Sequence, residues 1–120
     1  MILICRFAVD ADEAENFLSR ARRALGLLTA QQGCRGGQLV RSPDDTTRWV
    51  LAVQFESVVA GRRALSVFEV REHVVPLLSE ALTGEPGSYE VLADAQGGAV
   101  TDHRSLLVGD AQRGFGSVDR

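Results

Sequence analysis

The chain has 120 residues and a mass of 13.0 kDa, which is the size of one domain. Apolar residues make up 45% and charged residues 24%, and this globular composition excludes a disordered chain, a coiled coil and a collagen-like repeat. The net charge of −3 disfavours nucleic-acid binding, because that needs a concentrated basic surface.

The first predicted strand spans residues 2–9, a run of β-branched and aromatic side chains that ends at Asp10. Asp10 and Glu13 have the spacing of a capping box, so a helix is expected to start there and to end before Gly33. Apolar residues recur along it at steps of three and four, which is typical of an amphipathic helix. Its predicted inner face consists of Ala14, Phe17, Leu18, Ala21, Leu25 and Leu28.

A hairpin is predicted next, from residues 34–41 and 48–56 with a turn at 42–46. Gly36 and Gly37 indicate a bulge or a close approach of two backbones in its first strand. The second strand alternates strictly, and one face carries Trp49, Leu51, Val53 and Phe55.

Ser57 is predicted to cap a second helix, with Val58, Ala64, Leu65 and Phe68 on its inner side. Pro76 predicts a kink or break between Phe68 and Pro76, after which residues 76–82 resume a helix. The last predicted strand, 88–93, has Tyr89, Val91 and Ala93 on one face. Because glycines are frequent from residue 94 onward, we expect a folded domain over 1–93 and a tail or arm over 94–120. That segment is either loose or packed on a partner subunit through Leu106, Leu107 and Val108.

The order strand, helix, strand, strand, helix, strand is that of a ferredoxin-like split βαβ fold. This α+β class has a four-stranded antiparallel sheet with helices on one face. The predicted open face carries Ile4, Ala8, Val50, Ala52 and Leu92 beside Arg6, Gln54 and Glu90. So much apolar surface is unfavourable in water, and we expect two copies to pack sheet to sheet as a homodimer.

The chain offers few groups for metals or membranes. Cys5 and Cys34 are too few for a disulfide framework and wrongly spaced for zinc, and His73 and His103 have no acidic partner at ligand spacing. No metal site is therefore predicted. The N-terminus has neither a basic region nor a long apolar run, so we expect a cytoplasmic protein without a membrane segment.

Three segments together carry a resemblance: MILICRFAVDADEAENFL, the hairpin CRGGQLVRSPDD with RWVLAVQFES, and VREHVVPLLSEAL followed by PGSYEVL. They resemble the antibiotic biosynthesis monooxygenase family over residues 1–92. The resemblance implies a dimeric α/β barrel with a cavity in each subunit between the sheet and its helices. Members include cofactor-independent oxygenases of polyketide quinols, haem-degrading enzymes and proteins with no known reaction.

On this resemblance, Trp49 would be a flat wall for a planar substrate, with Phe55 on the same strand face and Tyr89 donating to a quinone oxygen. His73 would be a haem ligand or the base for a phenolic proton, because imidazole exchanges protons near neutral pH. Arg71 would join it only if the helix were irregular, since positions two apart do not share a helix face. Structural roles remain as alternatives: Trp49 in the core, His73 at the surface and Tyr89 packed with a hydrogen-bonded tip.

The resemblance favours a small monooxygenase without a cofactor that acts on an aromatic or polycyclic phenol or quinol. The alternative is a non-catalytic dimeric α/β-barrel protein that binds a small apolar ligand or acts as an accessory subunit. Haem degradation is less favoured, because that branch combines Asn, Trp and His, and the one Asn here, Asn16, falls on the first predicted helix. The two hypotheses differ in whether Trp49 and His73 share a cavity.

Overall fold

The computed structural model describes residues 1–105, which fall into two compact units, Met1–Tyr89 and a second that begins at Glu90. The first unit contains the main sheet and all the helices of the described residues. Its elements are β1 (Ile2–Ala8), the 3-10 turn η1 (Ala11–Glu13), α1 (Ala14–Thr29), β2 (Cys34–Arg41), β3 (Arg48–Phe55), α2 (Val58–Ser66), α3 (Phe68–His73), α4 (Val75–Leu78) and β4 (Ser88–Tyr89). The sheet is antiparallel in the order β2-β3-β1-β4.

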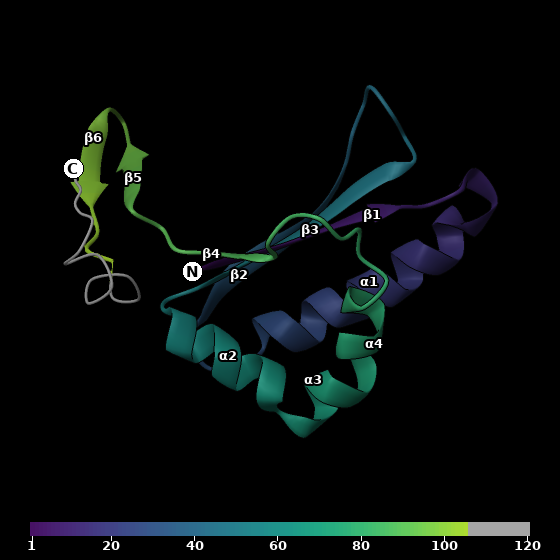
Figure 1. The fold of residues 1–120 in the computed structure, drawn as a ribbon, viewed down its shortest axis with the longest axis horizontal. Coiled ribbons are helices and arrows are strands. Elements are labelled where there is room, and N and C mark those ends of the chain that lie inside the picture. The colour runs from purple at the N-terminus through teal and green to yellow at the C-terminus, as the bar shows by residue number, and fades with distance from the viewer. Residues whose placement is uncertain (106–120) are drawn as a thin grey trace. The chain divides into compact units, whose positions relative to one another are not determined.

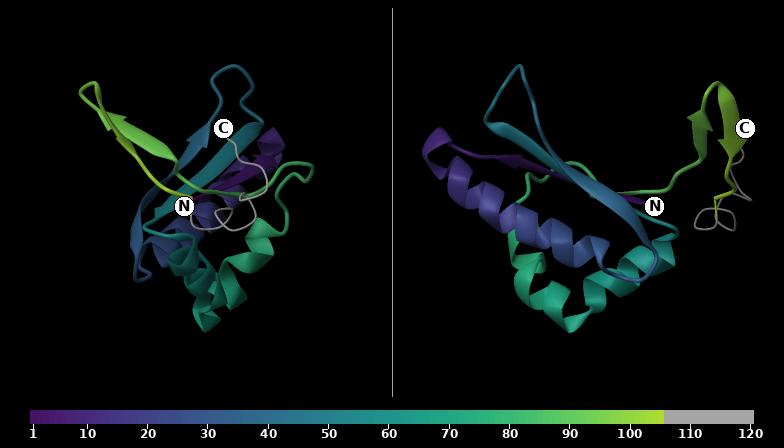
Figure 2. Two further views of the ribbon diagram at one scale, coloured as in Figure 1. Left: turned by 60° about the vertical axis from the view of Figure 1, so that its left-hand side comes forward. Right: turned by 180° about the vertical axis from the view of Figure 1, so that it is seen from behind.

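The helices of this unit lie together on one face of the four-stranded sheet, as Figure 1 and the two further views of Figure 2 show. The predicted α+β class and the ferredoxin-like strand order are thus confirmed. The strand register shows on which face of the sheet each side chain lies, because paired residues of neighbouring strands share a face. Leu3 pairs with Val53 and Phe7 with Trp49, and all four side chains are buried against the helices.

The start of α1 differs from the predicted capping box. The Asp10 side chain makes no cap hydrogen bond, because the Glu13 N–H donates to the Asp10 main-chain carbonyl at 2.9 Å and closes η1. The buried stripe of α1 consists of Phe17, Ala21, Ala24 and Leu28. Leu18 was predicted on the inner face, but it is 38% exposed, because it follows Phe17 and lies a quarter turn away from that stripe.

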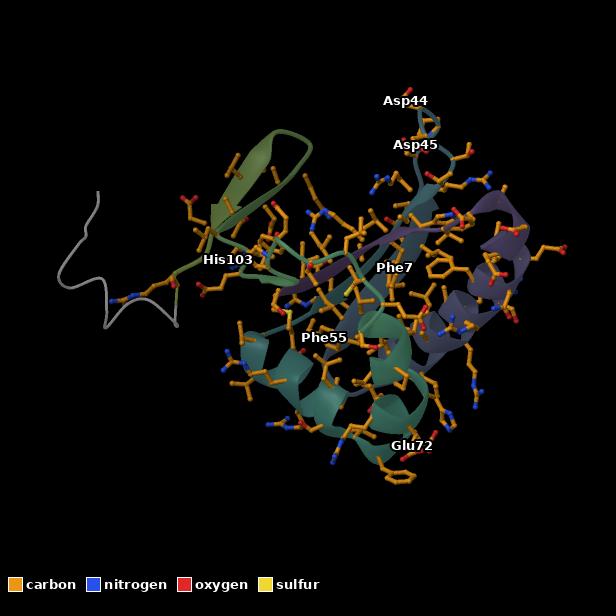
Figure 3. The ribbon with its side chains drawn as sticks, turned by 45° about the vertical axis from the view of Figure 1, so that its right-hand side comes forward. Phe7, Asp44, Asp45, Phe55, Glu72 and His103 are labelled. Atoms are coloured by element: carbon orange, nitrogen blue, oxygen red, sulfur yellow. The ribbon has the colours of Figure 1, made fainter. Side chains whose placement is uncertain are left out.

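The hairpin forms as predicted, including its irregularity. The β2–β3 register shifts between Cys34 and Gly36, and Gly36 has φ +130°, a conformation that a side chain would strain. At Gly37 a Cβ would lie 2.9 Å from the Ala52 carbonyl oxygen, so the two backbones do approach closely. Asp44 and Asp45 lie at the tip of the hairpin in Figure 3, where their N–H groups donate to Ser42 Oγ.

The predicted cap of the second helix is confirmed, since Ala60 N–H donates to Ser57 Oγ at 3.0 Å. The helical region then breaks twice, at Val67, whose backbone is extended, and at Val74. These breaks fall within or next to the predicted interval. Phe68 was expected on the inner side, but it is 73% exposed, because the chain turns at Val67 and α3 instead buries Val70. The last helix, α4, is shorter than the predicted 76–82.

The last strand of the main sheet is also shorter than predicted. β4 contains only Ser88 and Tyr89, which pair with Leu3 and Ile2. In the second unit, β5 (Ala93–Gln96) and β6 (Ala99–Asp102) form a hairpin in which His103 Nε2 lies 2.6 Å from Asp94 Oδ2. Leu106, Leu107 and Val108 lie outside the described residues, so their predicted packing stays a prediction. Within residues 1–105, no helix is both long enough and apolar enough to cross a membrane.

Candidate functional site

An aromatic cluster lies at one end of the helix-facing side of the sheet. Phe7 of β1 and Phe17 of α1 have ring centroids 4.9 Å apart, and Phe17 meets Trp49 of β3 edge to face at 5.4 Å. The pairing of Phe7 with Trp49 in the β1–β3 ladder and the inward face of α1 bring these rings together. Trp49 is 7% exposed, so its ring is largely a wall of the core.

The indole N–H of Trp49 has no hydrogen-bond partner among the described residues, and its nitrogen is fully buried. A buried donor without an acceptor costs about 1–3 kcal/mol, so such a group in a folded protein calls for an explanation. An oxygen atom of a ligand would satisfy this donor. Trp49 therefore combines a flat apolar surface with one unused donor, the two properties expected of a wall that orients an oxygenated aromatic ring.

Arg41 is the charged neighbour of this cluster. It pairs with Trp49 in the β2–β3 ladder, and its guanidinium carbon lies 5.2 Å from the centroid of the Trp49 ring. The arginine is exposed, whereas the indole beneath it is buried. A cation–π contact of this exposed kind contributes about 0.5–1 kcal/mol. Sequence analysis missed Arg41, although the predicted hairpin, once its register is known, places the two residues side by side.

Phe55, also predicted to bind substrate, lies on the same side of the sheet as Trp49 but at the other end of β3. Phe55 follows Trp49 by six positions along the strand, a distance of about 20 Å. Figure 3 shows Phe55 apart from Phe7, which marks the Trp49 end. Phe55 is 1% exposed and lies beside Met1 and Gly61, so it fills the core there. One small aromatic ring does not span both positions.

His73 and Arg71 lie on the exposed surface of α3. Val70 and Val74 are the buried positions of this segment, and Val74 N–H donates to the Val70 carbonyl at 2.8 Å, so the helical turn is regular up to His73. Residues two apart in a regular turn project in different directions. The structure therefore does not bring Arg71 and His73 together. Figure 3 shows their neighbour Glu72 pointing away from the sheet.

Tyr89 lies on the open face of the sheet, away from the helices. It is the register partner of Ile2, which alternates with the buried Leu3, so Ile2 and Tyr89 share the opposite face from Trp49. The five predicted site residues therefore occupy four places: Trp49 and Phe55 at opposite ends of the core, Arg71 and His73 on α3, and Tyr89 on the open face.

A shallow groove of about 250 Å³ runs along α1 and is lined by Glu15, Leu18, Ser19 and Arg22. It lies on the outer side of that helix, opposite the buried stripe, and none of the predicted site residues lines it. Within residues 1–105, no group of three or more His, Cys, Asp or Glu side chains is arranged to hold a metal ion. Burial raises the pKa of the Cys5 thiol, and neighbouring Arg6 opposes this, so Cys5 is a core residue and not a thiolate.

The fold and the site define a class, a ferredoxin-like α+β domain whose sheet and helices enclose an aromatic cluster. The family model described as antibiotic biosynthesis monooxygenase matches residues 1–74, more than half of the chain. The chain therefore belongs to the antibiotic biosynthesis monooxygenase family. The matched segment contains the whole aromatic cluster and ends just after His73.

Solved structures show the same fold. SnoaB, a cofactor-independent oxygenase from Streptomyces nogalater, is 24% identical with a TM-score of 0.58, and the match covers 88% of this chain and 94% of that one. A mutant of SnoaB is 26% identical with a TM-score of 0.58, covering 68% and 82%. Rv0793 from Mycobacterium tuberculosis is 22% identical with a TM-score of 0.57, covering 88% and 93%. The comparison with curated proteins finds no match.

Proposed function

We propose that this protein is a cofactor-independent monooxygenase that oxidises an aromatic or polycyclic phenol or quinol beside Trp49. The observation that carries the proposal is the buried indole N–H without an acceptor, inside an aromatic cluster of a chain that belongs to a monooxygenase family. The printed description of SnoaB as a cofactor-independent oxygenase supports the same reaction class.

In the proposed reaction the substrate itself supplies the electrons that reduce dioxygen, so no cofactor takes part. Loss of a proton from a phenol or quinol gives an anion that passes one electron to dioxygen. Recombination of the substrate radical with superoxide joins both oxygens to the ring carbon, and a proton completes a hydroperoxide. Cleavage of its O–O bond leaves one oxygen on the carbon as a carbonyl, and the other leaves as water with the hydroperoxide proton and the remaining hydrogen of that carbon. In this scheme Trp49 Nε1 donates to the substrate oxygen. His73 is exposed on α3, a different place from Trp49, so it is proposed to take the proton through solvent and not by direct contact with the substrate.

Oxygen uptake with an anthrone-type quinol tests this proposal. We expect the wild-type protein to consume oxygen above the uncatalysed rate. Replacement His73→Ala should lower kcat, by less than about 100-fold, the usual contribution of a general base in direct contact with its substrate. His103→Ala, the other histidine, lies in the second unit and is the matched control with unchanged uptake. No uptake by the wild type would reject the oxygenase, whereas equal rates for His73→Ala would remove only His73 from the mechanism.

A non-catalytic role is the second candidate, and one observation favours it. Trp49 is buried within the core, while His73 is exposed on α3. A protein that only binds a small apolar ligand, or serves as an accessory subunit, needs no base near the ring. Under this alternative an aromatic ligand quenches Trp49 fluorescence, but oxygen uptake stays at the uncatalysed rate.

The active unit is proposed to be a homodimer joined through the open face of the sheet. Ile2, Ile4, Val50 and Ala52 lie on that face and are half-buried, and Val40 beside them is exposed. A contiguous apolar sheet surface of this kind favours association with a second copy. The cytoplasmic location stays a prediction.

A further inference from the structure

Arg41 lies between the indole of Trp49 and the solvent. Its guanidinium is 5.2 Å from the ring centroid, and the side chain is exposed while the ring is buried. Exposed cation–π contacts are weak, so an incoming ring can displace the guanidinium without breaking other structure. Arg41 is therefore placed to cover Trp49 in the free protein and to move when a ligand arrives.

The charge of Arg41 is not neutralised by a carboxylate among residues 1–105. The ion pairs of this part of the chain join Arg20 to Glu80, Arg48 to Asp45, and His103 to Asp94. A guanidinium that stacks on a ring but has no carboxylate partner keeps its planar set of N–H donors available. Such a donor set matches a carboxylate or a phenolate oxygen, and hydrogen bonds to an ionised group are about twice as strong as neutral ones.

The unused N–H of Trp49 is a second observation on the same side chain. Trp49 is 7% exposed, and its buried Nε1 has no partner within the described residues. One donor is thus buried and neutral, and the other is exposed and charged. An aromatic ring that carries an acidic group can stack on the face of the indole that the guanidinium now covers and bind the guanidinium through its anionic group. Its oxygen reaches the indole N–H only if the ligand also displaces the core atoms that bury Nε1.

We propose that Arg41 is a specificity-determining residue that selects planar aromatic ligands carrying a negative charge, such as an aromatic carboxylate or a readily ionised phenol. The inference deepens the proposed function and rests on it for the position of the site at Trp49. It assigns the charge of the ligand, which the aromatic cluster alone does not determine.

Isothermal titration calorimetry with two probes tests this assignment. 2-Naphthoate and 2-naphthalenemethanol have the same ring system, and only the first is charged. We expect the wild type to bind 2-naphthoate about tenfold more tightly, and Arg41→Gln to lose that preference. Arg41→Lys keeps the charge but not the planar donor set, so it should retain part of the preference. Quenching of Trp49, the one tryptophan of the chain, locates the binding.

Arg48→Gln is the matched control. Arg48 precedes Trp49 in β3 but points to the other face, and its Nε lies 3.6 Å from Asp45 Oδ2. The inference predicts an unchanged preference in this variant. It is overturned if neither probe binds, if both variants lose the preference equally, or if Arg41→Gln binds like the wild type. Charge-selective binding without oxygen uptake would instead uphold the inference and reject the oxygenase.

Discussion

Trp49 carries most of the evidence for the proposed site, and it affects the stability of the fold in two opposite ways. Its ring packs on Phe17, which stabilises the fold, whereas its buried N–H without an acceptor opposes folding. Removal of the ring should therefore lower the free energy of unfolding, whereas removal of the N–H alone should raise it.

We expect Trp49→Phe to change the free energy of unfolding by less than about 1 kcal/mol, because the lost volume is offset by relief of the unsatisfied donor. Trp49→Ala should cost about 3–5 kcal/mol, the usual loss for a buried aromatic residue. Urea unfolding followed by circular dichroism measures both. A loss above 3 kcal/mol in Trp49→Phe would show that the N–H is satisfied in the folded protein and would weaken the proposed site.

The alternation of β3 was enough to predict from sequence that Trp49 and Phe55 face the helices. Alternation gives the face on which a side chain lies but not which residues share a site. Trp49 and Phe55 were therefore both predicted to bind substrate, although they lie at opposite ends of the core. Tyr89 was expected on that face because residues 88–93 were predicted as one strand. Its true face follows from the pairing with Ile2, and pairing between distant segments is not encoded in local alternation.

At the scale of elements, the sequence predicted a helix cap correctly where no main-chain carbonyl competed with the capping side chain for the N–H group. Ser57 caps α2 because the Ala60 N–H is free to donate to its side chain. Asp10 has an equally good capping sequence, but the main-chain carbonyl of Asp10 takes the Glu13 N–H and the side chain is left unused. Phe68 was misplaced for a related reason: the turn at Val67 resets the helical phase, which periodicity alone does not reveal.

One contact joins α1 to the segment that follows α4. Arg20 donates to both carboxylate oxygens of Glu80, from Nη1 at 3.2 Å and from Nη2 at 2.5 Å. These hydrogen bonds hold the pKa of Glu80 below its usual value, and slight burial opposes the shift. The two side chains are 40% and 50% exposed, so solvent screens the pair.

This pair predicts a small pH dependence of stability with a definite sign. Because the Glu80 pKa is lowered in the folded state, its contribution is present above the unfolded value of 4.5 and is lost as the pH falls through the folded value. We expect Arg20→Gln to reduce the free energy of unfolding by about 0.5 kcal/mol at pH 7, a difference that shrinks below pH 4.5. Chemical unfolding at pH 7 and pH 3 measures it, and a pH-independent difference would contradict the assignment.

At the scale of the whole molecule, the sheet has one face covered by helices and one that is open in the single chain. The open face carries Val50 and Ala52, which belong to β3, an inner strand of the sheet with β2 on one side and β1 on the other. Two copies related by a twofold axis would bring the same residues together, so a charge placed there occurs twice in the interface.

We therefore expect the protein to have a mass near twice 13.0 kDa by size-exclusion chromatography with light scattering. Val50→Arg should raise the dimer dissociation constant at least about 100-fold, because it buries two unpaired charges, while circular dichroism shows the fold intact. Val59→Arg is the control: Val59 is 63% exposed on α2, on the helix side of the sheet, and its replacement should leave the dimer unchanged. A wild type that stays monomeric, or a Val50→Arg variant that remains dimeric, would exclude the open sheet face as the interface.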